Sequence, residues 1–208
     1  MKHLLDFLEQ RTNRPLPHED QNLPSHIRDF RDGVSTPDRP PRVCAVMMSF
    51  FEDEGKIALP FMQRPDDGSV HGGQISFPGG GIEEADNDLF DTAIREAEEE
   101  IGIQVARSSI IGTLSEIYIP PSNSLGTPVL ASLPSRPESY TPDPNEVARV
   151  LEVAISDLRN PSNHTEKSVT LSDGRKMRFP AFGIDNYLIW GATARILSEL
   201  FLLLEELD

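Results

Sequence analysis

Residues Pro78 to Ile103 read PGGGIEEADNDLFDTAIREAEEEIGI, and this segment indicates the fold more clearly than any other part of the chain. Its glycines predict a loop that turns sharply or approaches a ligand closely, because glycine has no Cβ atom. Asn87 or Asp88 can then cap the N-terminus of a helix. Gly102 is expected to end this helix, because glycine accepts the left-handed conformation found there. The residues that recur at helical spacing and are expected to face a core are Phe90, Ala93, Ile94, Ala97 and Ile101.

Acidic residues crowd one side of this predicted helix. At 3.6 residues per turn, Glu96, Glu99 and Glu100 lie within about 100° of one another, whereas Glu98 points roughly opposite to Glu96. A cluster of like charges either stays in water or is neutralised, and a solvated surface is the plainer interpretation. Carboxylate oxygens are also suitable ligands for Mg²⁺ or Mn²⁺. The three acids are therefore candidate ligands of a divalent metal ion.

The stretch resembles the Nudix box, the signature of hydrolases that cleave nucleoside diphosphates linked to another group. The early glutamate of the box is replaced here by Asn87, which is flanked by Asp86 and Asp88. The resemblance implies an α+β fold, an α/β/α sandwich with a mixed β-sheet, in which the box forms a loop–helix–loop. The residues that match the box are Gly81, Arg95, Glu96, Glu99, Glu100, Gly102 and Ile103.

The resemblance also implies roles for these residues. Glu96 and Glu100 would bind the metal ion, and Glu99 would be a further ligand or would position the metal-bound water. Glu99 and Glu96 are the first candidates for activating that water. The backbone carbonyl of Gly80 would complete the site, and Arg95 would pair with a carboxylate of the same helix. The residues with structural roles in the box would be Arg95, Gly81 and Gly102.

The segment before the box resembles a motif of coenzyme A pyrophosphatases. In that motif an arginine is followed, at the spacing seen here, by a histidine, a Gly-Gln pair, an aliphatic residue and Phe-Pro-Gly-Gly. Gly68 and Ser69 stand where the motif has a Leu-Arg pair. The matching residues are Arg64, His71, Gly73, Gln74, Ile75 and Phe77, and further similarities lie in Pro121-Ser122-Asn123, Asn145-Glu146-Val147 and Ile189–Ala194.

Four residues outside the box are candidates for substrate binding or catalysis, each with a plainer alternative. Arg64 can bind phosphate oxygens or form a surface salt bridge. His71 can contact the substrate in either charge state or pack within its loop. Gln74 can contact the substrate or bond to the backbone. Glu146 can supply an extra base or metal ligand, or be an ordinary acid at a strand edge.

The resemblance implies metal-dependent hydrolysis of a small-molecule nucleotide, coenzyme A or its acyl derivatives, to 3′,5′-ADP and 4′-phosphopantetheine. The same chemistry on ADP-ribose or a dinucleoside polyphosphate is one alternative. A non-catalytic nucleotide-binding module on the same scaffold is another, although binding alone does not need all three acids. A simple calcium binder is the weakest alternative, because no stretch resembles an EF-hand loop.

Composition argues against several classes of partner. The chain has 208 residues, 38% of them hydrophobic, and a net charge of −15. These values predict a folded globular protein and argue against binding to nucleic acid or to an anionic membrane. The single cysteine, Cys44, lies in an apolar run and is expected to be buried and inert. Without a targeting signal or an apolar run of about 18 residues, a cytoplasmic location is expected.

Two regions are expected: residues 1–42, a short N-terminal helix with a proline-rich extension, and residues 43–208, the hydrolase domain. A final helix over Trp190–Leu207 is apolar over a broad arc, which predicts packing against the sheet or, alternatively, a homodimer interface. Strands are expected at Val43–Phe51, Lys56–Gln63, Ile110–Ile119, Thr127–Leu133 and Val147–Ile155, with a turn at Asp53-Glu54-Gly55 and a second hairpin, Val169–Leu171 and Met177–Phe182, around Ser172-Asp173-Gly174.

Overall fold

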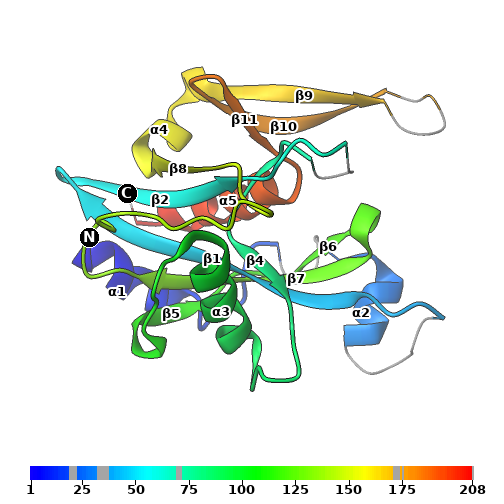
Figure 1. The fold of residues 1–208 in the computed structure, drawn as a ribbon, viewed down its shortest axis with the longest axis horizontal. Helices are drawn as coiled ribbons and strands as arrows, with labels where there is room; N and C mark the ends of the chain where they lie inside the picture. The colour runs from blue at the N-terminus through cyan, green and yellow to red at the C-terminus, as the bar shows by residue number, and fades with distance from the viewer. Residues whose placement is uncertain (19–22, 32–37, 69–71, 171–173, 175, 208) are drawn as a thin grey trace.

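The structure of the protein is a computed structural model, which describes residues 1–18, 23–31, 38–68, 72–170, 174 and 176–207. A mixed central sheet lies between helices, and a smaller three-stranded sheet lies beyond it (Figure 1). None of the helices within these ranges combines the length and the apolar character needed to cross a bilayer. The helices are α1 (Lys2–Arg11), α2 (Ser25–Arg31), α3 (Leu89–Ile101), α4 (Ile155–Arg159) and α5 (Gly191–Glu205), with 3₁₀ turns at Arg107–Ser109, Pro120–Ser122 and Pro161–Asn163.

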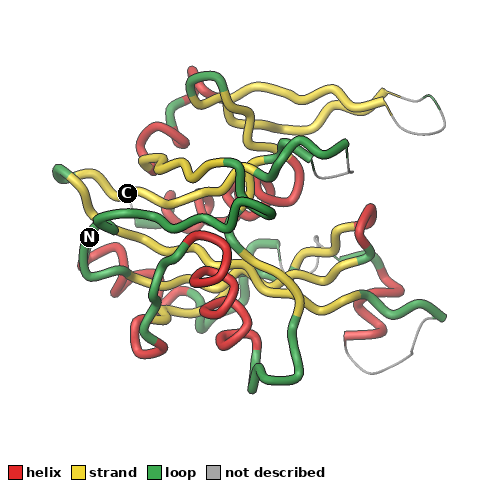
Figure 2. The backbone as a smooth tube through the Cα atoms, viewed as in Figure 1, coloured by secondary structure: helices red, strands yellow, loops and turns green. Residues whose placement is uncertain are grey.

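The central sheet, whose strands are among those drawn in yellow in Figure 2, is mixed. Its strands β1 and β7 run parallel, whereas its other paired strands run antiparallel. The strand order is β3-β2-β1-β7-β5, with β4 paired to β1, β6 to β7 and β8 to β2. The strands are β1 (Arg42–Asp53), β2 (Lys56–Gln63), β3 (Ile75–Ser76), β4 (Gly79–Gly81), β5 (Ile110–Thr113), β6 (Ile117–Ile119), β7 (Ser124–Ser132) and β8 (Arg149–Ala154).

The alternating side chains of β1 divide the hydrophobic core in two. Met48 and Phe50 belong to the cluster that includes α1 and α5, whereas Met47 and Phe51 belong to the cluster that includes α3. This division follows from strand geometry, because successive residues point to opposite faces of a sheet. Helices therefore cover both faces of the central sheet, which confirms the predicted α+β fold and its α/β/α sandwich.

The glycine run, expected as a loop, forms the short strand β4 along the first half of β1. Cys44 lies opposite Gly81 and Val46 lies opposite Gly79, while the last residues of β1 pair with β2. A Cβ atom at Gly79 would come 2.3 Å from the carbonyl oxygen of Ala45. Glycine is therefore required at this position, because any side chain would push the two strands apart.

The small sheet contains β9 (His164–Thr170), β10 (Lys176–Ile184) and β11 (Tyr187–Trp190), all antiparallel. The predicted second hairpin is β9–β10, although Ser172 and Asp173 of its predicted turn lie outside the described residues. The strand β11 was not predicted, and it ends with Trp190, which was expected to open the final helix. The helix begins one residue later, because Gly191 has a φ of 67° and redirects the chain.

Several predicted strands differ in their limits from the observed ones. The segment Ile110–Ile119 forms β5 and β6 instead of one strand, and the pairing of β5 with β7 shifts register between Ile110 and Gly112. The expected strand Val147–Ile155 starts two residues late, and its last residue instead begins α4. The helices α2 and α4 were not predicted, because such short segments show no clear helical period.

The terminal helices pack into one cluster of the core. Leu4 and Leu8 of α1 are buried there, so the first helix is part of the folded body. The apolar arc of α5 is buried within the chain, which confirms the predicted packing against the sheet; a homodimer stays a prediction. The buried residues of this arc are Ile196, Leu197, Leu200, Phe201, Leu203 and Leu204.

The thiol of Cys44 is expected to react slowly with alkylating reagents. Cys44 is partly buried and not fully buried as predicted. This partial burial raises its pKa to about 11, and its Sγ lies 3.4 Å from the carbonyl oxygen of Leu125. Because the thiolate is the reactive form, alkylation by iodoacetamide at about pH 8 should be much slower in the folded protein than in the denatured chain. Mass spectrometry over time checks this, and equal rates would contradict the burial seen here.

Candidate active site

Helix α3 is fixed at both ends by the residues that its sequence provides. Of the two candidate caps, Asp88 is the one used: its carboxylate accepts hydrogen bonds from the backbone N–H groups of Phe90 and Asp91, at 2.9 and 3.0 Å. Arg107 bonds to the carboxylates of Asp88 and Asp91 and braces this end. Gly102 ends the helix with a φ of 74°, as predicted. The helix therefore holds its acidic side in a defined direction.

Two carboxylates of α3, on successive turns, lie against β4. The backbone N–H of Gly79 donates to Oε2 of Glu100 at 2.7 Å. A Cβ atom at Gly80 would come 2.3 Å from Oε1 of Glu96, so the glycine leaves room for this carboxylate. The helix thus places the carboxylates of Glu96 and Glu100 beside the glycine strand.

Burial changes the proton affinity of both carboxylates. Glu100 is only 3% exposed, and this burial raises its pKa to about 8, against the opposing effect of the Gly79 N–H group. Burial also raises the pKa of Glu96, opposed by the neighbouring Arg95. Among the smaller contributions at Glu100, the charge of Arg64 lowers its pKa and that of Glu146 raises it. The fold therefore brings Arg64 and Glu146, both predicted from sequence, within electrostatic range of the acids.

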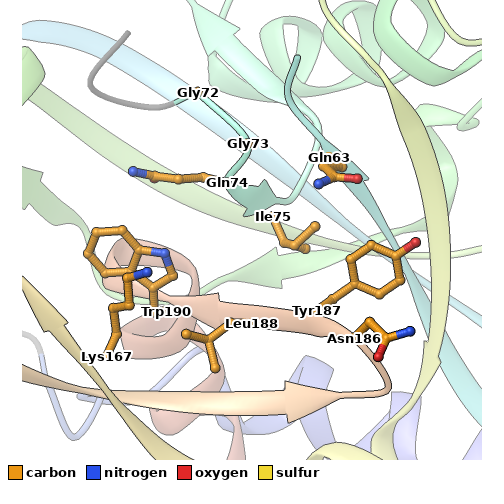
Figure 3. Close-up of a pocket in the computed structure, with 10 residues that line it drawn as sticks. All are labelled: Gln63, Gly72, Gly73, Gln74, Ile75, Lys167, Asn186, Tyr187, Leu188 and Trp190. Atoms are coloured by element: carbon orange, nitrogen blue, oxygen red, sulfur yellow. The ribbon is translucent and has the colours of Figure 1, made fainter. Parts of the chain in front are cut away.

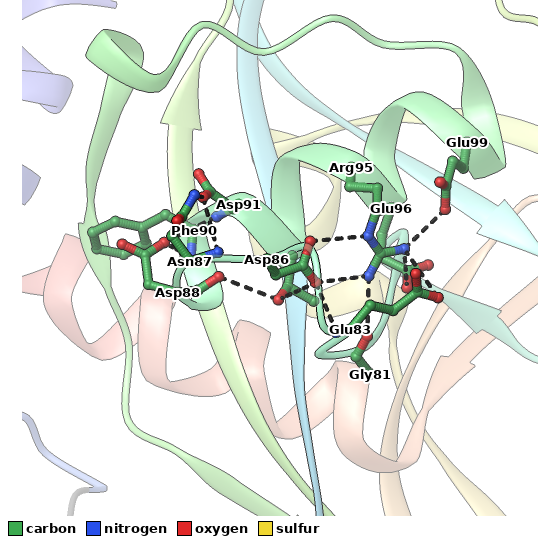
Figure 4. A network of polar contacts seen from close by, with 11 residues as sticks. Gly81, Glu83, Asp86, Asn87, Asp88, Phe90, Asp91, Arg95, Glu96 and Glu99 are labelled. Carbon is green, nitrogen blue, oxygen red and sulfur yellow. Dashed lines mark hydrogen bonds and ion pairs between the residues drawn. The ribbon is translucent and has the colours of Figure 1, made fainter.

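Arg95 connects the helix to the loop before it (Figure 4). Its Nε and Nη2 donate to the two carboxylate oxygens of Asp86 at 3.1 and 3.0 Å, and Nη2 also donates to the carbonyl oxygen of Gly81 at 3.0 Å. Its Nη1 donates to Glu96 at 3.0 Å and to Glu99 at 2.9 Å. Arg95 thus pairs with carboxylates of its own helix, as the resemblance implied, but Asp86 of the loop takes the bidentate contact.

Only two of the three carboxylates, those of Glu96 and Glu100, lie against β4. Glu96 and Glu100 lie on β4, whereas the side chain of Glu99 is 59% exposed and is held by Arg95. Across the described parts of the chain, no three acidic, histidine or cysteine side chains stand close enough to hold one ion together. Helical spacing predicted which acids share one side of the helix. It did not predict the rotamer of Glu99, because that rotamer depends on the contact with Arg95.

The remaining sequence candidates lie as follows. Arg64 directly follows β2, and its backbone N–H donates to the carbonyl oxygen of Gln74 at 3.0 Å. Gln74 also lines a cavity beside this segment. Glu146 is exposed in a turn, with its N–H bonded to the carbonyl of Asp143 at 3.1 Å. His71 lies outside the described residues.

The partner of Arg95 and one wall of the cavity were not predicted from the sequence. Asp86 was noted only as a neighbour of Asn87, yet its side chain is 4% exposed and also accepts a hydrogen bond from Thr92 at 2.9 Å. An aspartate that shortly precedes a helix containing an arginine was the available signal. Lys167 and Tyr187 come from β9 and β11, far along the chain, and no local pattern indicated them.

The pairing of Asp86 predicts a specific loss of stability in acid. The hydrogen bond from Arg95 lowers the pKa of Asp86 to about 2, below the value of about 3.9 expected in the unfolded chain. A carboxyl group whose pKa is lower in the folded than in the unfolded protein stabilises the fold at pH values above its unfolded pKa. This stabilisation is lost as the pH falls from about 4 to about 2. Urea unfolding should show that wild type and Asp86→Asn converge in stability over this window. A difference that does not change with pH would contradict the pairing.

Gly80→Ala is expected to lower activity without unfolding the protein. The new methyl group would meet the end of the Glu96 side chain, which can rotate away, so the fold survives while the carboxylate is displaced. Misplacing a catalytic group by about 1 Å costs on the order of a hundredfold in rate. Gly183→Ala is the control, because a Cβ atom there meets its neighbours only at 3.8 Å or more. Steady-state kinetics and a melting curve check both variants.

Several known proteins resemble this chain in sequence. The sequence matches the NUDIX domain over residues 40–172. It is 34% identical to "Nudix hydrolase 22, chloroplastic" of Arabidopsis thaliana over 76% of this chain and 53% of that protein. It is 34% identical to the uncharacterized Nudix hydrolase NudL of Photorhabdus laumondii, over 62% and 68%. It is 33% identical to the human mitochondrial coenzyme A diphosphatase NUDT8, over 61% and 53%.

A solved structure shares the fold. The MutT/nudix family protein from Enterococcus faecalis superposes with a TM-score of 0.59 over 91% of this chain and 72% of that one, at 14% identity. The chain spans about half the length of the plant and human relatives that it matches. The domain match covers well over half of the sequence and includes the whole of β4 and α3. The chain therefore belongs to the Nudix family.

Proposed function

We propose that this protein hydrolyses the pyrophosphate bond of coenzyme A or its acyl derivatives, giving 3′,5′-ADP and 4′-phosphopantetheine. The observation that carries the proposal is the placement of Glu96 and Glu100 against the glycine strand β4. A pyrophosphate is polyanionic, and its hydrolysis needs positive charge at the bridging oxygens and a positioned water. In this acidic chain, cations bound at its oxygen donors, together with its arginines, would supply that charge.

The residues present fit a hard divalent cation. Glu100 is almost completely buried, and a buried carboxylate is costly unless a cation or hydrogen bonds compensate it. The donors would be the carboxylates of Glu96 and Glu100, the carbonyl of Gly80 and, after leaving Arg95, the carboxylate of Glu99. Such an oxygen-only set suits Mg²⁺ or Mn²⁺. When bound, the ion would neutralise phosphate charge and lower the pKa of a bound water.

The other residues would position the reacting groups. Glu99 is solvent-exposed and can accept a proton from water, and Glu96 is the second candidate base. Glu146 is a further candidate, since its charge acts on the same carboxylates. Arg95 would hold Glu96 in its rotamer, and Arg64 would contact a phosphate oxygen, a role suited to a guanidinium group.

The choice of coenzyme A rests on the segment Arg64–Phe77 and on the relatives. The motif that precedes the box resembles that of coenzyme A pyrophosphatases, and the human and mouse relatives are named mitochondrial coenzyme A diphosphatases. A cytoplasmic location and a homodimer remain proposals from the sequence; some relatives are named as mitochondrial or chloroplastic.

A substrate panel tests the proposal. Coenzyme A, acetyl-coenzyme A, ADP-ribose and a dinucleoside tetraphosphate are assayed with Mg²⁺, with Mn²⁺ and with EDTA. We expect kcat/KM for coenzyme A to exceed that for ADP-ribose by at least about tenfold, equivalent to about 1.4 kcal/mol of transition-state binding, with no turnover in EDTA. Coenzyme A turned over no better than ADP-ribose would overturn the choice of substrate.

A further inference from the structure

A polar cavity of about 290 Å³ lies between the segment before the box and the small sheet (Figure 3). Gln63 and Gln74 contribute from one side, and Lys167, Tyr187 and Trp190 contribute from β9 and β11 on the other. Its volume is close to the lower end of the range typical of small-molecule sites. None of these residues except Gln74 was a candidate from the sequence.

Strand pairing places the cation and the indole of the cavity on one face of the small sheet. Lys167 lies opposite Phe179, and Trp190 lies opposite Ala181, two residues further along β10. Because side chains alternate along a strand, residues paired in this way point to the same face. The ammonium group of Lys167 accordingly lies 5.9 Å from the centroid of the Trp190 ring.

A hydrogen bond connects the two sides of the cavity, and the segment on one side continues to the strand that contacts Glu100. The hydroxyl of Thr193, at the start of α5, donates to the carbonyl oxygen of Ile75 at 3.2 Å. From Ile75 the chain runs directly to Gly79, whose N–H binds Glu100. Four extended residues span at most about 13 Å. The cavity therefore lies within a short reach of the candidate reaction centre.

The cavity combines features that recognise a phosphorylated base. Two aromatic rings line it, and each has a cation near it: Lys167 at Trp190 and Arg149, which is not itself a lining residue, at 5.7 Å from the Tyr187 ring. The amides of Gln63, Gln74 and Asn186 offer donors and acceptors to the edge of a base. Indole rings stack on purine bases, and an ammonium group binds phosphate as a point charge. The chain has a net charge of −15, so this grouping of cationic and aromatic side chains differs from the acidic character of the chain as a whole.

We propose that this cavity binds the 3′-phosphoadenosine end of the substrate, with the adenine against Trp190 and the 3′-phosphate on Lys167. The assignment rests on the proposed function, because a 3′-phosphate distinguishes coenzyme A from ADP-ribose. Lys167 is accordingly a specificity-determining residue. It meets a phosphate that is not cleaved, so it acts on binding and leaves the chemical step alone.

Trp190 is the only tryptophan of the chain, so its fluorescence reports directly on this cavity. Adenosine 3′,5′-bisphosphate is titrated in EDTA, where no hydrolysis occurs, with free N-acetyltryptophanamide as the correction for absorbance. We expect a saturable change in fluorescence. Lys167→Gln should weaken the Kd for this ligand at least about tenfold, the usual effect of losing a charged hydrogen bond. The Kd for adenosine 5′-monophosphate should change little.

Lys176→Gln is the matched control, because Lys176 is exposed on β10 and does not line the cavity. Its Kd values should equal those of wild type. No saturable fluorescence change, or the same Kd in both lysine variants, would overturn the assignment.

The substrate panel separates the two proposals. If coenzyme A is hydrolysed but Lys167→Gln changes neither the Kd nor KM, the cavity assignment fails and the function stands. If coenzyme A is not a preferred substrate but adenosine 3′,5′-bisphosphate binds in a Lys167-dependent manner, the function fails and the assignment stands as a 3′-phosphonucleotide site. In the enzyme, Lys167→Gln is expected to raise KM for coenzyme A at least about tenfold with kcat unchanged.

Discussion

Glu100→Gln is expected to lower kcat for pyrophosphate hydrolysis by at least about a hundredfold while the protein stays folded. Glutamine has nearly the same size, and its carbonyl oxygen can still accept the hydrogen bond from Gly79, which in wild type measures 2.7 Å. The substitution removes only the charge that would bind a metal ion. Metal-ion catalysis supplies several kcal/mol of transition-state stabilisation, and each 1.4 kcal/mol corresponds to about tenfold in rate.

Glu98→Gln is the control for this experiment. Glu98 lies on the same helix, next to Glu99, but it is exposed and its carboxylate accepts a hydrogen bond from Gln104 at 3.3 Å. Its kcat should equal that of wild type, and the melting temperatures of both variants should stay close to the wild-type value. Full activity in Glu100→Gln, alone or combined with Glu99→Gln, would reject the proposed site.

Arg95→Met is expected to cause the largest loss of stability among single substitutions in the site. The side chain of Arg95 is 18% exposed and that of Asp86 is 4% exposed, so the pair is partly buried. Removing one partner breaks the charged hydrogen bonds of the pair, which costs about 1.5–3 kcal/mol. For a chain of this size, that corresponds to a fall in Tm of roughly 3–12 °C. Denaturant unfolding and calorimetry measure both quantities.

A double-mutant cycle isolates the pair from the rest of the network. Asp86→Asn combined with Arg95→Met removes both charges, so its destabilisation should be clearly smaller than the sum of the two single effects. Arg95→Lys should fall in between, because an ammonium group cannot reproduce the bidentate contact. Strict additivity in the cycle, or an Arg95→Met variant as stable as wild type, would mean that Arg95 is not the brace of this site.

The local sequence pattern was sufficient to predict the fold class and the helix that carries the acidic residues. Gly102 ends α3 as expected, and Lys56–Gln63 forms β2 with the predicted limits and turn. These features are set by neighbours in the chain: a glycine that accepts positive φ, or an alternation that faces a core. Their prediction needs no knowledge of distant contacts.

The features that sequence reasoning missed depend on contacts between distant segments. The glycine run became a strand because β1 lies beside it, and Glu99 turned from its neighbours because Arg95 binds it. Lys167 and Trp190 meet only because β9 and β11 pair with the same strand, β10. Helical spacing fixes which side chains share a side of a helix, but rotamers and strand partners are decided by the packed molecule.

The most direct test of the central claim is an anomalous difference map from crystals soaked in Mn²⁺. A single dominant peak is expected between α3 and β4, bounded by the carboxylates of Glu96 and Glu100 and by the carbonyl oxygen of Gly80. Glu99 should then have turned from Arg95 toward the ion. A map without density at this place, or with manganese bound only to exposed acids elsewhere, would contradict the account.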